Sequence, residues 1–270
     1  MKTKPRPGFI LTELLVVIAT ITSLGCSLTQ RSLSPPNSHA KEPLRFQITS
    51  RLEIPSDDGQ QGVATDGKHA YVQNTQQLFK YKLDGSLVKA GPKVDLHHGG
   101  IVYVNGRVYA AVSGCEPTGS TQHHVHVYDA QSLALIEQHD LGPHFTVCAG
   151  GIAHRKGHFF LAESFFDDEH LDRVVEFDSF FRHIKTHVID FKSPFGIQGL
   201  EYLPTTDQFQ VHSHDKTFYR INSRFERDSL IVGQANFELQ DLARLNSKTL
   251  LVNHRDAQTL EFIKLKMEHK

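Results

Sequence analysis

A run of apolar residues that opens with Gln or Gly occurs five times along the chain, and this repeat limits the fold more than any other feature. The five runs begin at Gln61, Gly99, Gly150, Gln198 and Gln240. The intervals between them are 38, 51, 48 and 42 residues, and a period of about 40 to 50 residues is typical of four-stranded propeller blades. In the first two units the next turn is Asp66-Gly67 or Asn105-Gly106, which favours a tight hairpin because both central residues can take positive φ.

The third strand of each unit alternates apolar and polar side chains and ends near a turn residue, as in Val125 to Asp129 and Val174 to Asp178. An outer strand follows in the first four units but not in the fifth. Residues 45–52 have the pattern of such an outer strand and precede the first blade. We therefore predict an all-β fold, a single five-bladed β-propeller over residues 45–270 in which strand 45–52 closes the last blade. A six-bladed ring is the alternative.

Composition narrows the classes of partner. The 29 basic and 30 acidic residues give a formal net charge of -1, so electrostatics do not favour nucleic acid or an anionic membrane surface as a partner. Trp is absent, which removes the aromatic residue best suited to binding methylated cations. His is abundant, at 18 residues, and the places where the histidines gather are therefore of interest.

The N-terminal residues have the pattern of an export signal. Lys2, Lys4 and Arg6 precede an apolar run over 9–24, as a positively charged region precedes the hydrophobic region of a signal peptide. We predict that residues 1–26 are a signal or a helical membrane anchor and that the Ser- and Pro-rich residues 27–44 are a flexible linker. The remaining residues would lie outside the cytoplasm of a bacterium, in the periplasm or at the cell surface.

Two processing patterns overlap in this segment. The stretch Gly8 to Val17 resembles the leader of type IV prepilins and pseudopilins, in which cleavage follows Gly and a Glu, here Glu13, is fifth in the mature chain. The stretch Ser23-Leu24-Gly25-Cys26 resembles a bacterial lipoprotein signal, which implies lipidation of Cys26. Either pattern would anchor the protein to a membrane, and simple secretion is the third alternative.

Residues at one end of the predicted ring can meet. The connections that enter the inner strands and those that join the second and third strands lie at the same end of a propeller, where loops can carry chemistry that packed blades cannot. The residues that we expect to bind a ligand at this His-rich channel mouth are Gln61, His97, His98, Gln198, Gln240 and His254. A small molecule or a peptide is the expected ligand.

The histidines could also hold a metal ion. His212 and His214 alternate at the end of a strand, which would point both side chains to the same side. Together with His98 they form a candidate site for a divalent ion such as Zn or Ca. The sequence contains no His-Glu-x-x-His or Cys-x-x-Cys spacing, and any other cofactor is unknown. For any one of these histidines, a solvated loop position is the simpler interpretation.

Cys115 and Cys148 belong to the same predicted end of the ring. Disulfides persist in oxidising compartments, so in an exported protein we predict a bond between these two residues. This pairing leaves Cys26 for the lipid.

Two segments resemble a known enzyme family. Gln198-Gly199-Leu200, preceded by Phe195, resembles the Phe-Thr-Gln-Gly-Leu signature of the plant and bacterial glutaminyl cyclotransferases, which are five-bladed propellers. The segment Phe160 to Ser164 resembles the Phe-Glu-Ser segment that carries the catalytic Glu of that family, which implies that Glu163 is a general acid/base. In the family both signatures lie in one blade, whereas here they fall in successive blades and His212 occupies the Glu position of the Gln198 blade.

Three functions remain open on this basis. The first is an exported, membrane-tethered propeller that binds a small or peptidic ligand at the channel mouth. The second is a cyclotransferase-like or metal-assisted hydrolytic enzyme that uses Glu163. The third is a pseudopilin-like surface component displayed by the N-terminal anchor.

Overall fold

The computed structural model describes residues 44–55, 58–116, 119–167, 169–254 and 259–267. The expectations for residues 1–43, including the export signal, the linker and lipidation of Cys26, lie outside the described residues. Within the described ranges, no helix combines the length and the hydropathy needed to cross a membrane. The regular helical structure there consists of two short 3-10 turns, Gly142–His144 and Arg227–Ser229.

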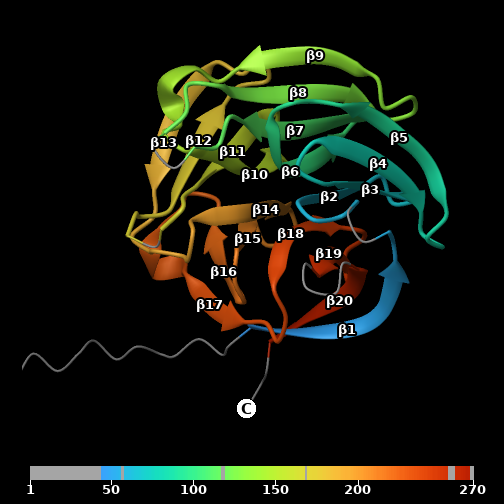
Figure 1. Cartoon of the computed structure of the whole chain (residues 1–270). Helices are drawn as coiled ribbons and strands as arrows, with labels where there is room; N and C mark the ends of the chain where they lie inside the picture. Colours follow the sequence, from blue (N-terminus) through green and yellow to red (C-terminus); the bar gives the residue numbers. More distant parts are fainter. Residues whose placement is uncertain (1–43, 56–57, 117–118, 168, 255–258, 268–270) are drawn as a thin grey trace, which may run out of the picture. The chain divides into compact units, whose positions relative to one another are not determined.

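The described strands form five four-stranded antiparallel blades around a common axis (Figure 1). Blade 1 contains β2 (Gly62–Thr65), β3 (His69–Gln73), β4 (Gln77–Lys82) and β5 (Leu87–Lys93), and blade 2 contains β6 (His97–Val104), β7 (Arg107–Ser113), β8 (His123–Asp129) and β9 (Leu135–Asp140). Blade 3 contains β10 (Cys148–Arg155), β11 (His158–Ser164), β12 (Arg173–Phe177) and β13 (His183–Val188). Blade 4 contains β14 (Ile197–Leu203), β15 (Gln208–Ser213), β16 (Thr217–Asn222) and β17 (Ile231–Gln234). Blade 5 contains β18 (Leu239–Arg244), β19 (Leu250–His254), β20 (Thr259–Met267) and β1 (Leu44–Glu53).

The five blades close into a ring. Each inner strand contacts the inner strand of the next blade, and β18 contacts β2. In blade 5, β1 pairs antiparallel with β20 from Leu44 opposite Met267 to Glu53 opposite Thr259, so segments from both ends of the propeller share one sheet (Figure 1). This pairing covers a sheet edge that would otherwise be exposed. The prediction of a five-bladed all-β propeller is confirmed, and the six-bladed alternative is wrong for the described part of the chain.

The hydrophobic core lies between the blades. Five clusters of buried apolar side chains are present, and each is shared by two neighbouring blades. The cluster between blades 2 and 3, for example, contains Val127 from β8, Phe159 from β11 and Phe177 from β12. The outer strands β5, β9 and β13 are mainly exposed. The alternating apolar side chains predicted from the sequence therefore pack each blade against its two neighbours. Phenylalanine is the main large side chain of this core, in a chain without Trp.

The inner strands of four blades carry a β-bulge at the same level. The register shifts between His98 and Ile101 in β6, Ala149 and Ile152 in β10, Ile197 and Gly199 in β14, and Leu239 and Leu242 in β18. A Cβ atom on Gly150 would lie 2.1 Å from Ser164 Oγ and 2.3 Å from the Ile197 carbonyl oxygen, so only glycine allows this approach of blades 3 and 4. The close backbones narrow the channel here. A bulge also redirects the side chains at its position, which applies to Gln198 and Gln240.

The tight turns at the opposite end follow the sequence signals with one difference. Asn105 and Gly106 take φ values of 48° and 83°, as the Asn-Gly signal predicts. In the Asp66-Gly67 turn only Gly67 has positive φ, 85°. There the Asp66 carboxylate accepts hydrogen bonds from the backbone N–H groups of Lys68 and His69, at 2.8 and 2.7 Å, and this side-chain turn replaces the expected backbone geometry.

Candidate functional site

One end of the channel opens into a pocket of about 400 Å³ to which all five blades contribute; we call it the mouth pocket. Its lining consists of Gln61, His97, Gly99, Cys115, Cys148, Ala149, Gly150, Ser164, Phe165, Phe166, Phe195, Gln198, His214 and Gln240. Four of the six residues that we expected to bind a ligand lie in it: Gln61, His97, Gln198 and Gln240. The lining contains no Asp, Glu, Lys or Arg, so its polar groups are carboxamides, imidazoles and one hydroxyl.

Three glutamine side chains form a connected chain across the mouth pocket. Gln240 donates from Nε2 to Oε1 of Gln61 at 3.0 Å and to Oε1 of Gln198 at 3.1 Å. Gln198 Nε2 in turn donates to the carbonyl oxygen of Phe195 at 3.1 Å. The three residues come from β18, from the position before β2, and from β14, so the inner edges of three blades hold one another in place. Among the described residues, Gln61 Nε2 donates no hydrogen bond, although Gln61 is only 6% exposed.

Aromatic side chains form one wall. Phe195 has φ 60°, an uncommon conformation for a residue with a side chain, and is 43% exposed. Its carbonyl accepts from the N–H of Phe165 at 2.8 Å, and its ring meets that of His214 with centroids 5.6 Å apart. A Cβ atom on Gly196 would lie 2.8 Å from the Glu163 carbonyl oxygen, so glycine is required for the chain to pass so near β11. This tight passage holds the Phe195 ring at the rim.

A disulfide links Cys115, which follows β7, to Cys148 at the start of β10, with the two Cα atoms 4.9 Å apart. Both cysteines line the mouth pocket. Ser113 strengthens the same junction, because its Oγ accepts from the N–H of Ala149 at 2.9 Å and contacts His123 Nδ1 at 3.0 Å. A disulfide and a hydrogen bond thus join blades 2 and 3 where they border the mouth pocket.

The floor of the channel is a buried carboxylate that the sequence signals did not identify. Asp241 is 1% exposed and follows Gln240 in the bulge of β18. Its carboxylate accepts from the N–H groups of Val63 at 3.0 Å, Ile101 at 3.2 Å and Leu242 at 2.9 Å, which joins blades 5, 1 and 2. Burial raises the pKa of Asp241 well above its usual value, while the three N–H groups oppose that shift. Because Asp241 occupies the position that is Gly in the other four repeats, the repeat alignment contained this signal.

Glu163 does not line the mouth pocket. Its side chain is fully buried, and Oε1 accepts from both the N–H and the hydroxyl of Thr146, each at 2.6 Å. Oε2 lies 2.8 Å from Nη1 of Arg173. A general acid/base needs access to its substrate and exchangeable protonation. In this structure the Glu163 carboxylate is held by Arg173 and Thr146, and its catalytic role stays a prediction.

The three proposed metal ligands are not grouped. Within the part of the chain that the structure describes, no set of three or more His, Cys, Asp or Glu side chains could hold a metal ion. His212 is fully buried beside the ring of Phe218, whereas His214 lies in the mouth pocket. Strand β15 ends at Ser213, so the alternation that would align the two rings stops between them. His98 is buried in blade 2, where its Nε2 lies 3.3 Å from the hydroxyl of Tyr128.

Burial decides the charge of these histidines. It lowers the pKa of His98 to about 3, with the nearby His126 adding to the shift, and it lowers the pKa of His212 to about 3. Both rings are therefore neutral at pH 7. His254 also lies outside the mouth pocket, because its ring packs on Phe237 and its Nδ1 lies 3.1 Å from Glu261. Thus His98, His212 and His254 belong to the packed blades.

Comparisons with known proteins agree with the fold. No protein-family model matches the chain, and no curated protein matches it in sequence. The crystal structure of the glutaminyl cyclase of Myxococcus xanthus superposes with a TM-score of 0.65 at 12% identity, over 84% of this chain and 100% of that one. A Bacteroides thetaiotaomicron protein of unknown function superposes with a TM-score of 0.50 at 11% identity, over 83% of this chain and 76% of that one. The chain therefore has the propeller fold of a glutaminyl cyclase, as the two sequence segments predicted.

Proposed function

We propose that the protein binds an uncharged polar ligand, either a small amide-containing molecule or a segment of a peptide, in the mouth pocket. The observation that carries this proposal is the lining itself, in which three linked carboxamides face aromatic rings and no carboxylate, ammonium or guanidinium group is present. An amide ligand can both donate to and accept from a carboxamide, so it can join the glutamine chain without leaving a buried charge unpaired.

The geometry gives a ligand two attachment points. Gln61 Nε2 has no acceptor among the described residues, and a carbonyl oxygen of the ligand would supply one. The rings of Phe165, Phe166 and Phe195 offer apolar area beside it. This combination of a few fixed polar groups with apolar walls is typical of small-molecule sites.

Calorimetric titration of the full chain with two matched ligands tests the proposal. N-acetylglutamine amide is uncharged, whereas N-acetylglutamate amide has the same shape and one negative charge. We expect the uncharged ligand to bind at least roughly tenfold more tightly, about 1.4 kcal/mol. Gln240→Leu, which breaks the glutamine chain, should weaken binding by a similar factor, while Gln138→Leu on the exposed strand β9 should not. Equal binding of both ligands, or no effect of Gln240→Leu, contradicts the proposal.

Catalysis is the second candidate function, and the superposition on the whole chain of the Myxococcus xanthus glutaminyl cyclase favours testing it. The assay is turnover of a peptide with an N-terminal glutamine by the wild type and by Glu163→Gln. The burial of Glu163 against Arg173 leads us to expect no turnover that depends on the Glu163 carboxylate. Turnover that is lost in Glu163→Gln, with the fold intact, would restore Glu163 to a catalytic role.

The proposed cellular setting is outside the cytoplasm, with the N-terminal segment as a membrane anchor. The basic and apolar residues of positions 1–24 and the disulfide between Cys115 and Cys148 both support this setting. Labelling cells with a lipid precursor, with Cys26→Ala as the control, tests the lipoprotein form. N-terminal sequencing that finds Phe9 as the first residue would instead support the prepilin-like form.

A further inference from the structure

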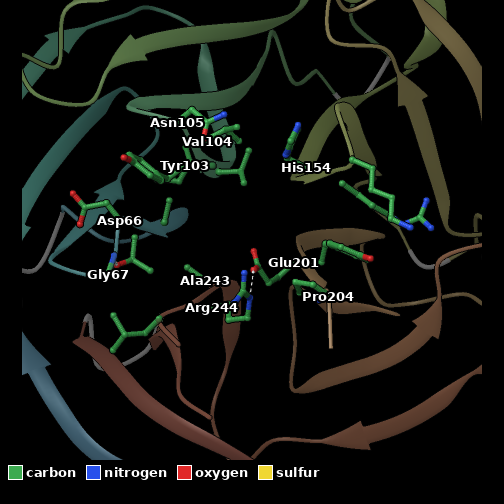
Figure 2. A pocket seen from close by; sticks show the side chains of 18 residues that line it. Asp66, Gly67, Tyr103, Val104, Asn105, His154, Glu201, Pro204, Ala243 and Arg244 are labelled. Atoms are coloured by element: carbon green, nitrogen blue, oxygen red, sulfur yellow. Dashed lines mark hydrogen bonds and ion pairs between the residues drawn. The ribbon is translucent and has the colours of Figure 1, made fainter. Parts of the chain in front are cut away.

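The channel has a second opening at the end opposite the mouth pocket. The turns between the first and second strands of all five blades surround a cavity of about 530 Å³ there, which we call the turn-side cavity (Figure 2). Its lining consists of Ala64, Thr65, Asp66, Gly67, Ile101, Val102, Tyr103, Val104, Asn105, His154, Arg155, Lys156, Glu201, Tyr202, Pro204, Ala243, Arg244 and Leu245. It has no lining residue in common with the mouth pocket. Between the two cavities lie the buried carboxylate of Asp241 and the glycines, such as Gly150, at which the inner strands approach closely.

Two opposite charges stand side by side in this cavity. Glu201 on β14 and Arg244 at the end of β18 approach with Oε1 and Nε 3.8 Å apart, and Figure 2 shows both near its centre. This separation is an ion pair without a side-chain hydrogen bond. Among the described residues the Arg244 guanidinium donates to no acceptor within hydrogen-bond distance, and its side chain is exposed. The guanidinium therefore retains unused hydrogen-bonding capacity, whereas the Glu201 carboxylate already has the backbone N–H of Arg244 beside it.

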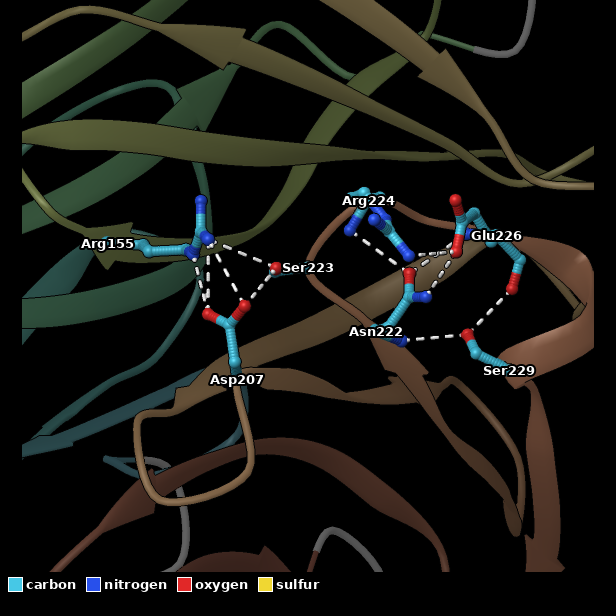
Figure 3. A network of polar contacts seen from close by, with 7 residues as sticks. All are labelled: Arg155, Asp207, Asn222, Ser223, Arg224, Glu226 and Ser229. Atoms are coloured by element: carbon cyan, nitrogen blue, oxygen red, sulfur yellow. Dashed lines mark hydrogen bonds and ion pairs between the residues drawn. The ribbon is translucent and has the colours of Figure 1, made fainter.

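Two other charged side chains of the lining, Asp66 and Arg155, already form hydrogen bonds within the protein. Asp66 accepts from two backbone N–H groups and from the ring of His69 at 2.9 Å. Arg155 donates to the carboxylate of Asp207 and, at 3.1 Å, to Ser223, as Figure 3 shows. Lys156 lies exposed in its turn. Glu201 and Arg244 are thus the two neighbouring opposite charges of the described lining that no side-chain hydrogen bond joins.

We propose that the turn-side cavity binds a free zwitterionic amino acid, whose carboxylate pairs with Arg244 and whose ammonium pairs with Glu201. In an α-amino acid the ammonium and the carboxylate are bonded to the same carbon, so the two charges are adjacent, as those of Glu201 and Arg244 are. A simple anion would meet the Glu201 carboxylate, and a simple cation would meet the Arg244 guanidinium. A guanidinium is also well shaped to hold a carboxylate with two hydrogen bonds.

The rest of the cavity suits the side chain of such a ligand. Tyr103, which stacks on Tyr71 with centroids 5.8 Å apart, presents a rigid aromatic face, and Pro204 adds apolar surface. The ring of His154 packs on Phe159 and has no hydrogen-bond partner among the described residues, so its nitrogens can bond to a polar side chain of the ligand. Burial raises the pKa of Glu201 to about 7, and a bound ammonium would hold the carboxylate ionised.

The test is calorimetric titration of the full chain with the common L-amino acids, followed by two blocked forms of the best binder. N-acetylation removes the ammonium, and amidation removes the carboxylate. We expect the free amino acid to bind with a dissociation constant of micromolar to millimolar order, and each blocked form to bind at least roughly tenfold more weakly. Absence of binding by every amino acid at millimolar concentration overturns the proposal, and so does equal binding of the blocked forms.

Variants locate the site. Glu201→Gln and Arg244→Gln should each weaken binding at least roughly tenfold. The matched controls are Arg224→Gln and Glu226→Gln, which change an exposed ion pair of 2.9 Å on the protein surface (Figure 3) and should leave affinity unchanged. Arg244→Lys keeps the charge and serves if Arg244→Gln does not fold. If Gln240→Leu weakens amino-acid binding while Arg244→Gln does not, the ligand binds in the mouth pocket and the proposal is wrong.

Discussion

The mouth pocket presents three carboxamides and two imidazoles, whereas the turn-side cavity at the other end of the same channel presents a carboxylate beside a guanidinium. The difference follows from the segments that form each end. The mouth pocket is formed by the bulges of the inner strands and by long connections, and these segments place Gln and Phe side chains in its lining. Short turns and strand ends form the other opening, where charged residues are common because they can reach solvent. One ring of blades thus encloses two chemically distinct cavities.

The largest expected effect distinguishes buried histidines of the blades from exposed ones. Burial lowers the pKa of His98, His126 and His212 to about 3, 4 and 3, below the unfolded value of 6.5. As pH falls below 6.5 the unfolded chain therefore binds protons first, and stability is lost until the folded pKa is reached. We expect the free energy of unfolding to fall by about 2 kcal/mol per histidine, or about 6 kcal/mol for the three together, between pH 7.5 and 5.

Urea unfolding at several pH values measures this loss. His212→Asn should flatten the pH dependence, while Gln138→Asn, a change of a non-titrating residue on the exposed strand β9, should not change it. An unfolding free energy that stays constant from pH 7.5 to 5 would show that these rings are not held neutral.

Two arginine–carboxylate pairs give the next comparison. Arg173→Met leaves the fully buried Glu163 without its 2.8 Å partner and should cost about 3 to 5 kcal/mol, as expected for a broken buried pair. Arg244→Met leaves Glu201, which is 15% exposed and 3.8 Å from its partner, and should cost about 1 kcal/mol or less. Chemical denaturation of both variants at pH 7 measures the difference. Equal losses would mean that Glu163 is not the more tightly held carboxylate.

Two glycines compare the close approach of the inner strands with an open turn: Gly150 lies between blades 3 and 4, and Gly67 lies in the first turn of blade 1. Gly150→Ala places a methyl group 2.1 Å from Ser164 Oγ and 2.3 Å from the Ile197 carbonyl, and it should cost about 3 kcal/mol. Gly67→Ala meets no atom within 4 Å, and its φ of 85° should cost about 1 kcal/mol through backbone strain alone. Thermal unfolding of the two variants compares crowding with strain. If Gly67→Ala is the more destabilising, the glycine approach of blades 3 and 4 is looser than the structure indicates.

The smallest expected effect concerns communication between the ends. Because the Asp241 floor and the close backbones lie between the two openings, occupation of one should change affinity at the other by less than about twofold, a coupling below about 0.4 kcal/mol. Titrating the amide ligand in the presence and absence of the amino acid measures this coupling. A change of roughly tenfold or more would show that the two sites share a ligand-sensitive element.

The sequence by itself determined the blades and much of the mouth. Strand alternation, turn residues and the five-fold repeat are local signals, and they predicted the propeller and the meeting of Gln61, Gln198 and Gln240. Cys115 and Cys148 were likewise predicted as partners, because both follow or precede strands that reach the same end. The two family-like segments pointed to the fold that the superposition shows.

Only the tertiary structure decided which polar residues are open. Alternation gives the side of a strand but not what the neighbouring blade or loop places against it, so Arg173 and Thr146 could enclose Glu163 without a local signal. The end of β15 at Ser213 separated His212 from His214, and bulges redirected Gln198 and Gln240. The pairing of Glu201 with Arg244 joins residues of different blades, and closure of the ring is what brings them together.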